Sequence, residues 1–119
     1  MKAFIKAMNA RDFAGVEALL ADNFRLIDNA DKELTGREPC LALFRRVAEL
    51  APDYQLEVDR MVVHGDDILI AGKSRTTSPE MGSATQWRAR ATPTRMLEWQ
   101  SYSNALTPSM ITLVQRTED

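Results

Sequence analysis

The chain has 119 residues, 45% of them hydrophobic and 27% charged, which are the proportions of one globular domain with its own core. A formal net charge of -2 provides no basic surface for nucleic acid, and apolar runs of at most five residues are too short to span a membrane. The single cysteine, Cys40, excludes an intramolecular disulfide, and the single histidine argues against a Cys/His metal site. The first residues lack the apolar core of a signal peptide. We therefore expect a cytoplasmic protein that needs no metal or other cofactor and contacts neither nucleic acid nor a membrane.

The amino-terminal part of the chain predicts two helices and a strand. Residues 4–8 carry apolar side chains spaced for one face of a first helix. Asp12 is a favourable N-cap for a second helix, whose apolar residues recur at helical spacing over residues 13–20. Residues 21–23 are expected to end this helix, and residues 24–28 predict a short apolar strand.

A third helix is predicted to begin near Thr35 and to end at Ala51. Thr35 and Glu38 have the spacing of a capping box, in which the threonine caps the helix and the glutamate reaches back to the cap. The residues on one side of this helix are apolar and predict its buried face: Cys40, Leu43, Phe44, Val47, Leu50 and Ala51.

A long β-hairpin is predicted over residues 54–77. Residues 64–67, His-Gly-Asp-Asp, are typical of a tight turn, and apolar runs flank them on both sides. The alternation of apolar and polar residues changes phase near Arg60, which indicates a β-bulge or a strong twist at that point. Lys73 and Arg75 are expected to pair with acidic residues across the hairpin.

Two further strands are predicted, over residues 86–91 and 96–104. Their alternation places Trp87 and Trp99 on the inward face, together with small or apolar residues. The side chains of the opposite face are polar, and we expect them to contact solvent, a partner subunit or an anionic ligand. They are Arg88, Arg90, Glu98, Gln100 and Tyr102.

The order of these elements predicts an α+β fold, with the helices covering one face of a curved, mainly antiparallel sheet. A bent sheet that is half-wrapped around helices leaves an open end, and small molecules commonly bind in such openings. The apolar run 110–114 near the end of the chain is either an extra edge strand or a swapped arm.

Four stretches of the sequence resemble the nuclear-transport-factor-2-like superfamily: Phe4–Phe13, Leu20–Phe24, Leu34–Glu38 and Met96–Tyr102. Within it the chain is similar to small bacterial SnoaL-like proteins, relatives of polyketide cyclases and ketosteroid isomerases. The resemblance covers roughly residues 4–104, and it implies a single domain over residues 1–119 with residues 105–119 as a poorly matched tail. It also implies a cystatin-like cone, in which three helices and a curved sheet enclose an apolar pocket, and a homodimer through the outer face of the sheet.

The resemblance to ketosteroid isomerases implies a catalytic role for Asp28. Asp28 matches the general base of those enzymes, at the end of the strand after the second helix. Their two hydrogen-bond donors are not matched, because Phe4 replaces the tyrosine and the strand of the second donor carries Gln86 and Trp87. One such donor lowers the barrier by about 3–4 kcal/mol, so steroid isomerisation by that mechanism is not expected.

Two other relatives of the fold lack their catalytic acids here. Limonene epoxide hydrolases use an Asp-Arg-Asp arrangement, but the matching positions carry Ser101, Lys73 and Arg75. Polyketide cyclases use an acid near the end of the final strand, where this chain has Ser103 and Asn104. Paired acids for general acid-base catalysis are therefore not available at these positions.

Each of the candidate acid-base residues also has a structural interpretation. Asp28 is followed by Asn29 and Asp31, and such residues stabilise turns through local hydrogen bonds to the backbone. His64 has an ordinary pKa near neutrality, but its position in the hairpin turn favours an exposed residue.

Phe4, Trp87, Trp99 and Ser101 are the candidate substrate-binding residues, with core packing as the alternative for the aromatic ones. Two functions follow from these candidates. The protein either binds a small apolar molecule in the cone and acts as an isomerase, cyclase or hydratase with Asp28 as general base, or it is a non-catalytic module for ligand binding or dimerisation.

Overall fold

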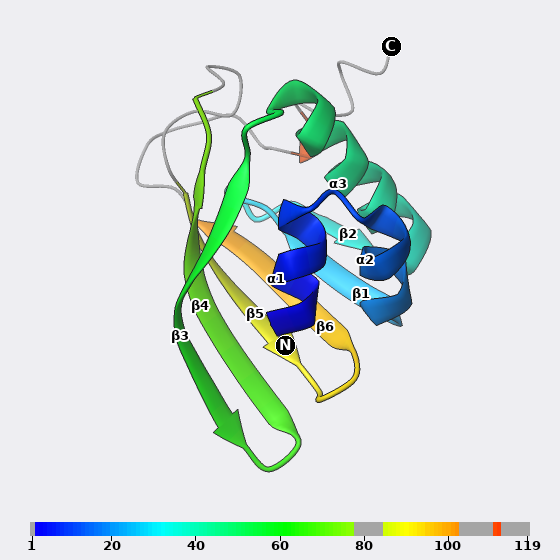
Figure 1. Cartoon of the computed structure of the whole chain (residues 1–119). Coiled ribbons are helices and arrows are strands. Elements are labelled where there is room, and N and C mark those ends of the chain that lie inside the picture. The colour runs from blue at the N-terminus through cyan, green and yellow to red at the C-terminus, as the bar shows by residue number, and fades with distance from the viewer. Residues whose placement is uncertain (1, 78–84, 103–110, 113–119) are drawn as a thin grey trace.

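The computed structural model describes residues 2–77, 85–102 and 111–112, in which three helices lie on one face of a six-stranded sheet (Figure 1). The helices are α1 (Lys2–Asn9), α2 (Phe13–Leu19) and α3 (Arg37–Leu50). The strands are β1 (Leu20–Ile27), β2 (Glu33–Thr35), β3 (Gln55–His64), β4 (Asp67–Arg75), β5 (Thr85–Ala91) and β6 (Met96–Tyr102). Their order in the sheet is β2-β1-β6-β5-β4-β3, and only the β1–β6 pair is parallel. The predicted α+β fold with a mainly antiparallel sheet is confirmed.

Helix α2 is shorter than the sequence predicted, and the strand after it is longer. The predicted cap is confirmed, because the Oδ1 atom of Asp12 accepts a hydrogen bond of 3.0 Å from the amide of Gly15. The prediction that the helix reaches Leu20 is wrong, since β1 already begins at that residue. Leu20 is fully buried and pairs with Met96 of β6, so pairing with a distant strand outweighs the local helical pattern.

The predicted capping box of α3 is also wrong. The N-cap of α3 is Gly36, which makes no side-chain capping bond, and Thr35 belongs to β2, where it pairs with Arg25. Gly36 has φ +108°, a backbone conformation that residues with a Cβ rarely adopt. Its amide donates a hydrogen bond of 2.8 Å to the carbonyl of Phe24, which fixes the start of α3 against β1.

The hairpin of β3 and β4 agrees with its prediction. The two strands are joined at Gly65 and Asp66, and Gly65 has the positive φ of a tight turn. The register shifts between Val58 and Arg60, so the predicted bulge is confirmed. Beyond this bulge Arg60 pairs with Ala71.

Strands β5 and β6 place Trp87 and Trp99 inward, as their alternation predicted. A register shift between Arg90 and Ala91 brings Met96 into the core, whereas the sequence pattern pointed to Leu97. Of the apolar run predicted near the carboxyl end, only residues 111–112 are described, and they lie in a helical turn. The rest of that run lies outside the described residues. None of the described helices is long and apolar enough to cross a membrane.

Candidate functional site

The inward face of the sheet carries a cluster of aromatic rings. The rings of Trp87 and Trp99 are stacked with their centroids 4.2 Å apart and their planes inclined by 20°. Phe4 of α1 lies against Trp99, with a centroid separation of 5.8 Å, and Phe44 of α3 lies 6.2 Å from Phe4. All four side chains are buried. The structure thus brings the predicted pocket-lining aromatic residues together between the sheet and the helices.

The two indole N–H groups of this stack differ in their hydrogen bonding. Nε1 of Trp99 donates a hydrogen bond of 3.2 Å to the hydroxyl of Ser101, which is buried beside it. Nε1 of Trp87 has no hydrogen-bond partner among the described residues, although Trp87 is only 1% exposed. A buried donor without an acceptor costs about 1–3 kcal/mol, so native structures rarely keep one without a reason.

Gly72 of β4 makes room for the ring of Trp87. A Cβ atom at residue 72 would lie 2.4 Å from Cζ2 of Trp87 and 2.0 Å from the carbonyl oxygen of Glu57. Glycine is therefore required for the indole to lie against the strand. Gly72 was not predicted as a site residue, although a glycine inside a strand pattern is a known signal of such a close approach.

Two further polar side chains are buried in the sheet region, Tyr54 and Ser74. Burial raises the pKa of Tyr54, while a hydrogen bond with Ser74 and the charge of Arg11 act in the opposite direction. The tyrosine therefore stays neutral, and its hydroxyl is held by hydrogen bonding. Arg11 also donates to the carbonyl oxygen of Tyr54 at 2.6 Å.

Asp28 lies directly after β1, with 1% of its surface exposed. Its Oδ1 atom accepts hydrogen bonds from the amides of Ala30 at 2.9 Å and Lys32 at 3.0 Å. Its Oδ2 atom accepts a hydrogen bond of 3.0 Å from the amide of Ile111. The carboxylate is therefore buried, and its hydrogen bonds stabilise the turn between β1 and β2. The role of Asp28 as a general base stays a prediction.

The only histidine, His64, is exposed at the end of β3, next to the hairpin turn. Among the described residues no three His, Cys, Asp or Glu side chains converge in a way that could hold a metal ion.

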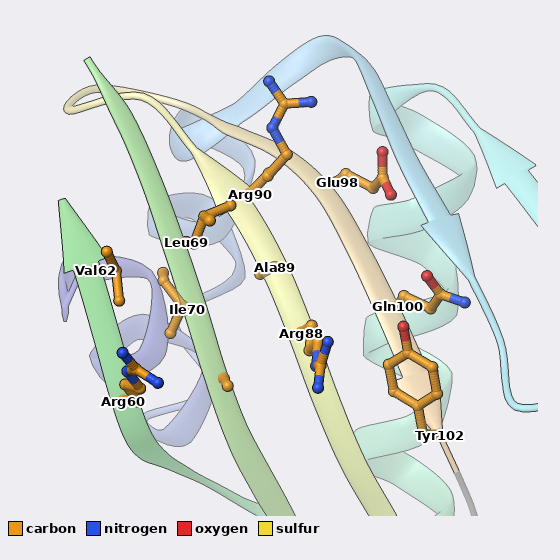
Figure 2. Close-up of a pocket in the computed structure, with 11 residues that line it drawn as sticks. Arg60, Val62, Leu69, Ile70, Arg88, Ala89, Arg90, Glu98, Gln100 and Tyr102 are labelled. Atoms are coloured by element: carbon orange, nitrogen blue, oxygen red, sulfur yellow. The ribbon is translucent and has the colours of Figure 1, made fainter. Parts of the chain in front are cut away.

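A hollow of about 540 Å³ lies on the face of the sheet that points away from the helices. Figure 2 shows its side chains standing on strands β3 to β6. It includes the outward polar residues that the sequence predicted on β5 and β6, and it adds residues of the hairpin that were not predicted as site residues: Arg60, Val62, Leu69, Ile70 and Ala71.

The cone of curved sheet and helices defines the cystatin-like, nuclear-transport-factor-2-like class of folds. Residues 1–98 match the model of a protein family, the SnoaL-like domain, and the chain belongs to this family. No curated protein matches the chain. The predicted membership of the SnoaL-like group is therefore confirmed.

Solved structures show the same fold. One is a cystatin-fold protein from Novosphingobium aromaticivorans, which is 16% identical, with a TM-score of 0.70 and coverage of 86% of this chain and 93% of that one. An NTF2-like protein from Burkholderia pseudomallei is 19% identical, with a TM-score of 0.67 and coverage of 87% and 86%. A protein with a ketosteroid isomerase-like fold from Catenulispora acidiphila, solved with trimethylamine, is 15% identical, with a TM-score of 0.65 and coverage of 86% and 82%. At these identities the similarity establishes the fold, which hosts many different functions.

Proposed function

We propose that the protein binds a small, mainly apolar molecule between its helices and its sheet, with a hydrogen-bond acceptor that pairs with Nε1 of Trp87. The observation that carries the proposal is the buried indole N–H of Trp87, which has no acceptor among the described residues. A ligand that supplied the acceptor would remove the cost of this unpaired donor.

The surroundings of Trp87 fit such a ligand. Its ring is stacked on Trp99, and Phe4 continues the aromatic surface toward the helices. The neighbouring position on β6 carries the small residue Ser101, which pairs with Trp87 across the sheet. An apolar enclosure with a few polar groups is the usual composition of a small-molecule site.

A ketone and a hydrocarbon of the same shape test this proposal. We expect 4-tert-butylcyclohexanone to change the intrinsic fluorescence of the two tryptophans saturably, because its carbonyl oxygen accepts from Trp87. Tert-butylcyclohexane has the same apolar body and no acceptor, and we expect it to bind about tenfold more weakly. Equal affinities for the two compounds would contradict the assigned role of Trp87.

Two matched variants separate the hydrogen bond from the aromatic surface. Trp87→Phe removes the unpaired N–H, and Trp99→Phe removes an N–H that is already bonded to Ser101. Both variants keep an aromatic ring and one fluorescent tryptophan. We expect the preference for the ketone to be lost in Trp87→Phe and kept in Trp99→Phe, and the reverse result would overturn the proposal.

Catalysis with Asp28 as general base is a second candidate function. It is supported by the burial of this carboxylate at the end of β1, where the resemblance to ketosteroid isomerases implies a base. Its hydrogen bonds with backbone amides weigh against it, because they occupy both carboxylate oxygens.

Exchange of protons next to a carbonyl group tests this second function. In deuterated water a general base would catalyse deuterium incorporation beside the carbonyl of 4-tert-butylcyclohexanone, which NMR measures directly. Catalysis by Asp28 requires that exchange is lost in Asp28→Asn and kept in Asp31→Asn, an exposed acid of the same turn. Equal exchange rates in the wild type and Asp28→Asn would remove Asp28 as the base.

A further inference from the structure

The edge of the Trp87 indole that carries the N–H lies next to strand β3. Cε2, the ring atom bonded to Nε1, would lie 2.8 Å from a Cβ atom at residue 72, so this edge of the ring occupies the space over Gly72. Gly72 pairs with Val58 of β3, and residues that pair directly across two antiparallel strands project to the same face of the sheet. One strand spacing, about 5 Å, separates the two residues. Val58 is therefore the side chain of β3 that lies beside the N–H edge of Trp87 on the inner face.

Val58 is exposed although it projects to the inner face. Its exposed fraction is 39%, whereas Leu56, the preceding inward residue of β3, is 3% exposed and Trp87 is 1% exposed. β3 is the last strand of the sheet, and its register shifts directly after Val58, where a bulge bends the strand. The layer between the sheet and the helices therefore meets solvent at Val58.

Helix α1 is fastened to β3 just before Val58. Nδ2 of Asn9, the last residue of α1, donates a hydrogen bond of 2.9 Å to the carbonyl of Leu56. Oδ1 of Asn9 accepts a hydrogen bond of 2.7 Å from the amide of the same residue. Figure 1 shows the β3–β4 hairpin continuing beyond the helices. The two bonds close the layer at Leu56, and Val58 is the first inward side chain of β3 beyond this closure.

We propose that Val58 forms the entrance to the site at Trp87 and selects the carbonyl compounds that bind there. This inference rests on the function proposed above. The acceptor of the ligand would lie beside Val58, so this side chain limits the bulk next to the acceptor and favours ketones whose adjacent carbons are unsubstituted. The entrance is on the inner side of β3, so the homodimer expected through the outer face of the sheet would leave it open.

Hydrogen exchange of the Trp87 indole N–H tests the entrance without a ligand. This N–H has no hydrogen-bond partner among the described residues, so its exchange depends on how readily water reaches it. Val58→Ala should speed the exchange about threefold and Val58→Phe should slow it by a similar factor, measured by magnetisation transfer from water to ¹⁵N-labelled protein. The indole N–H of Trp99, which is bonded to Ser101, is the internal reference.

Val62 supplies the matched control. It is also 39% exposed and belongs to the same strand, but it pairs with Leu69, which is 49% exposed on the outer face. Val62→Ala and Val62→Phe should therefore leave the exchange of the Trp87 N–H unchanged. Unchanged exchange in both Val58 variants, or equal changes in the Val62 variants, would overturn the proposal.

Two isomeric ketones test the selection. 4-tert-Butylcyclohexanone is unsubstituted beside its carbonyl, whereas 2,2,6,6-tetramethylcyclohexanone carries four methyl groups there. We expect the wild type to bind the first ketone at least about tenfold more tightly, measured by tryptophan fluorescence. This preference should shrink in Val58→Ala, which removes bulk at the entrance, and persist in Val62→Ala. Equal affinities of the wild type for the two isomers, or an unaltered preference in Val58→Ala, would overturn the selection.

The entrance and the proposed function fail in different ways. If neither ketone binds while the exchange of the Trp87 N–H responds to the Val58 variants, the proposed function is refuted and Val58 remains the route to the indole. If 4-tert-butylcyclohexanone binds while the Val58 variants alter neither the exchange nor the preference, the proposed function stands and Val58 is not the entrance.

Discussion

At the scale of single residues, Asp28 is buried, and its carboxylate accepts hydrogen bonds from the backbone amides of three residues. Its carboxylate joins the turn after β1 to the amide of Ile111, which is far away in the sequence. From the sequence, Asp28 was either a general base or a residue that stabilises a turn, and the structure shows a buried carboxylate that accepts hydrogen bonds within a turn. Asp28 is buried in this turn because the amide of Ile111 donates a hydrogen bond to its carboxylate. No local pattern in residues 24–32 could indicate the position of residue 111.

The substitution Asp28→Asn should therefore reduce stability. The asparagine oxygen can still accept from Ala30 and Lys32, but its NH₂ group would face the amide of Ile111, donor against donor. We expect a loss of about 1–3 kcal/mol in the free energy of unfolding, measured by urea denaturation. Asp31→Asn is the control, because Asp31 is exposed with φ +61°, which asparagine tolerates, and its effect should stay within about 0.5 kcal/mol. Equal stability of the two variants would show that Asp28 is not a structural acceptor.

Cys40 gives a prediction about pH. Burial raises the pKa of its thiol from 9.0 to about 11. Folding therefore favours the neutral thiol, so the stability contributed by this group is fully present below pH 9 and is lost as the pH rises toward 11. At pH 8 we expect a thiol reagent such as DTNB to react with the folded protein far more slowly than with protein unfolded in urea. Equal reaction rates would show that Cys40 is accessible.

At the scale of elements, the hairpin and its bulge were predicted correctly, whereas two boundaries were not. The sequence signals of a hairpin are local. They are the turn residues 64–67 and the alternation of apolar and polar residues on each side of the turn. The start of β1 at Leu20 and the cap of α3 at Gly36 depend on pairing between strands, Leu20 with Met96 and Thr35 with Arg25. The first pairing joins distant parts of the chain and the second joins two strands across a turn, and the helical patterns that were used to place these boundaries contain neither pairing.

The β4 strand should not tolerate a side chain at residue 72. In Gly72→Ala the new Cβ atom would collide with the carbonyl of Glu57 and the ring of Trp87, so we expect a loss of about 3 kcal/mol in the free energy of unfolding. The control is Gly65→Ala, where a Cβ atom meets nothing within 4 Å and only the φ of +64° opposes it, at a cost of about 1 kcal/mol. Thermal and urea unfolding measure both. A smaller loss in Gly72→Ala than in Gly65→Ala would contradict the packing described for Trp87.

At the scale of the whole molecule, the sheet has an aromatic inner face and a charged outer face. Alternation along the strands predicted that Trp87 and Trp99 face inward and that Arg88 and Arg90 face outward. It could not predict that the indole N–H of Trp99 has a hydrogen-bond acceptor while that of Trp87 has none among the described residues, because this difference depends on the position of Ser101. It also could not identify which charged residues of the outer face form ion pairs, since a pair such as Arg90–Asp67 is a property of the assembled sheet.

The central claim is that the unpaired N–H of Trp87 receives an acceptor from a bound molecule. The most direct measurement is the ¹H–¹⁵N spectrum of the two indole N–H groups during titration with 4-tert-butylcyclohexanone. We predict a saturable downfield shift of the Trp87 indole proton, a small change at Trp99, and no comparable Trp87 shift with tert-butylcyclohexane. A Trp87 indole signal that stays in place while the ketone binds, or that moves equally with the hydrocarbon, would contradict the claim.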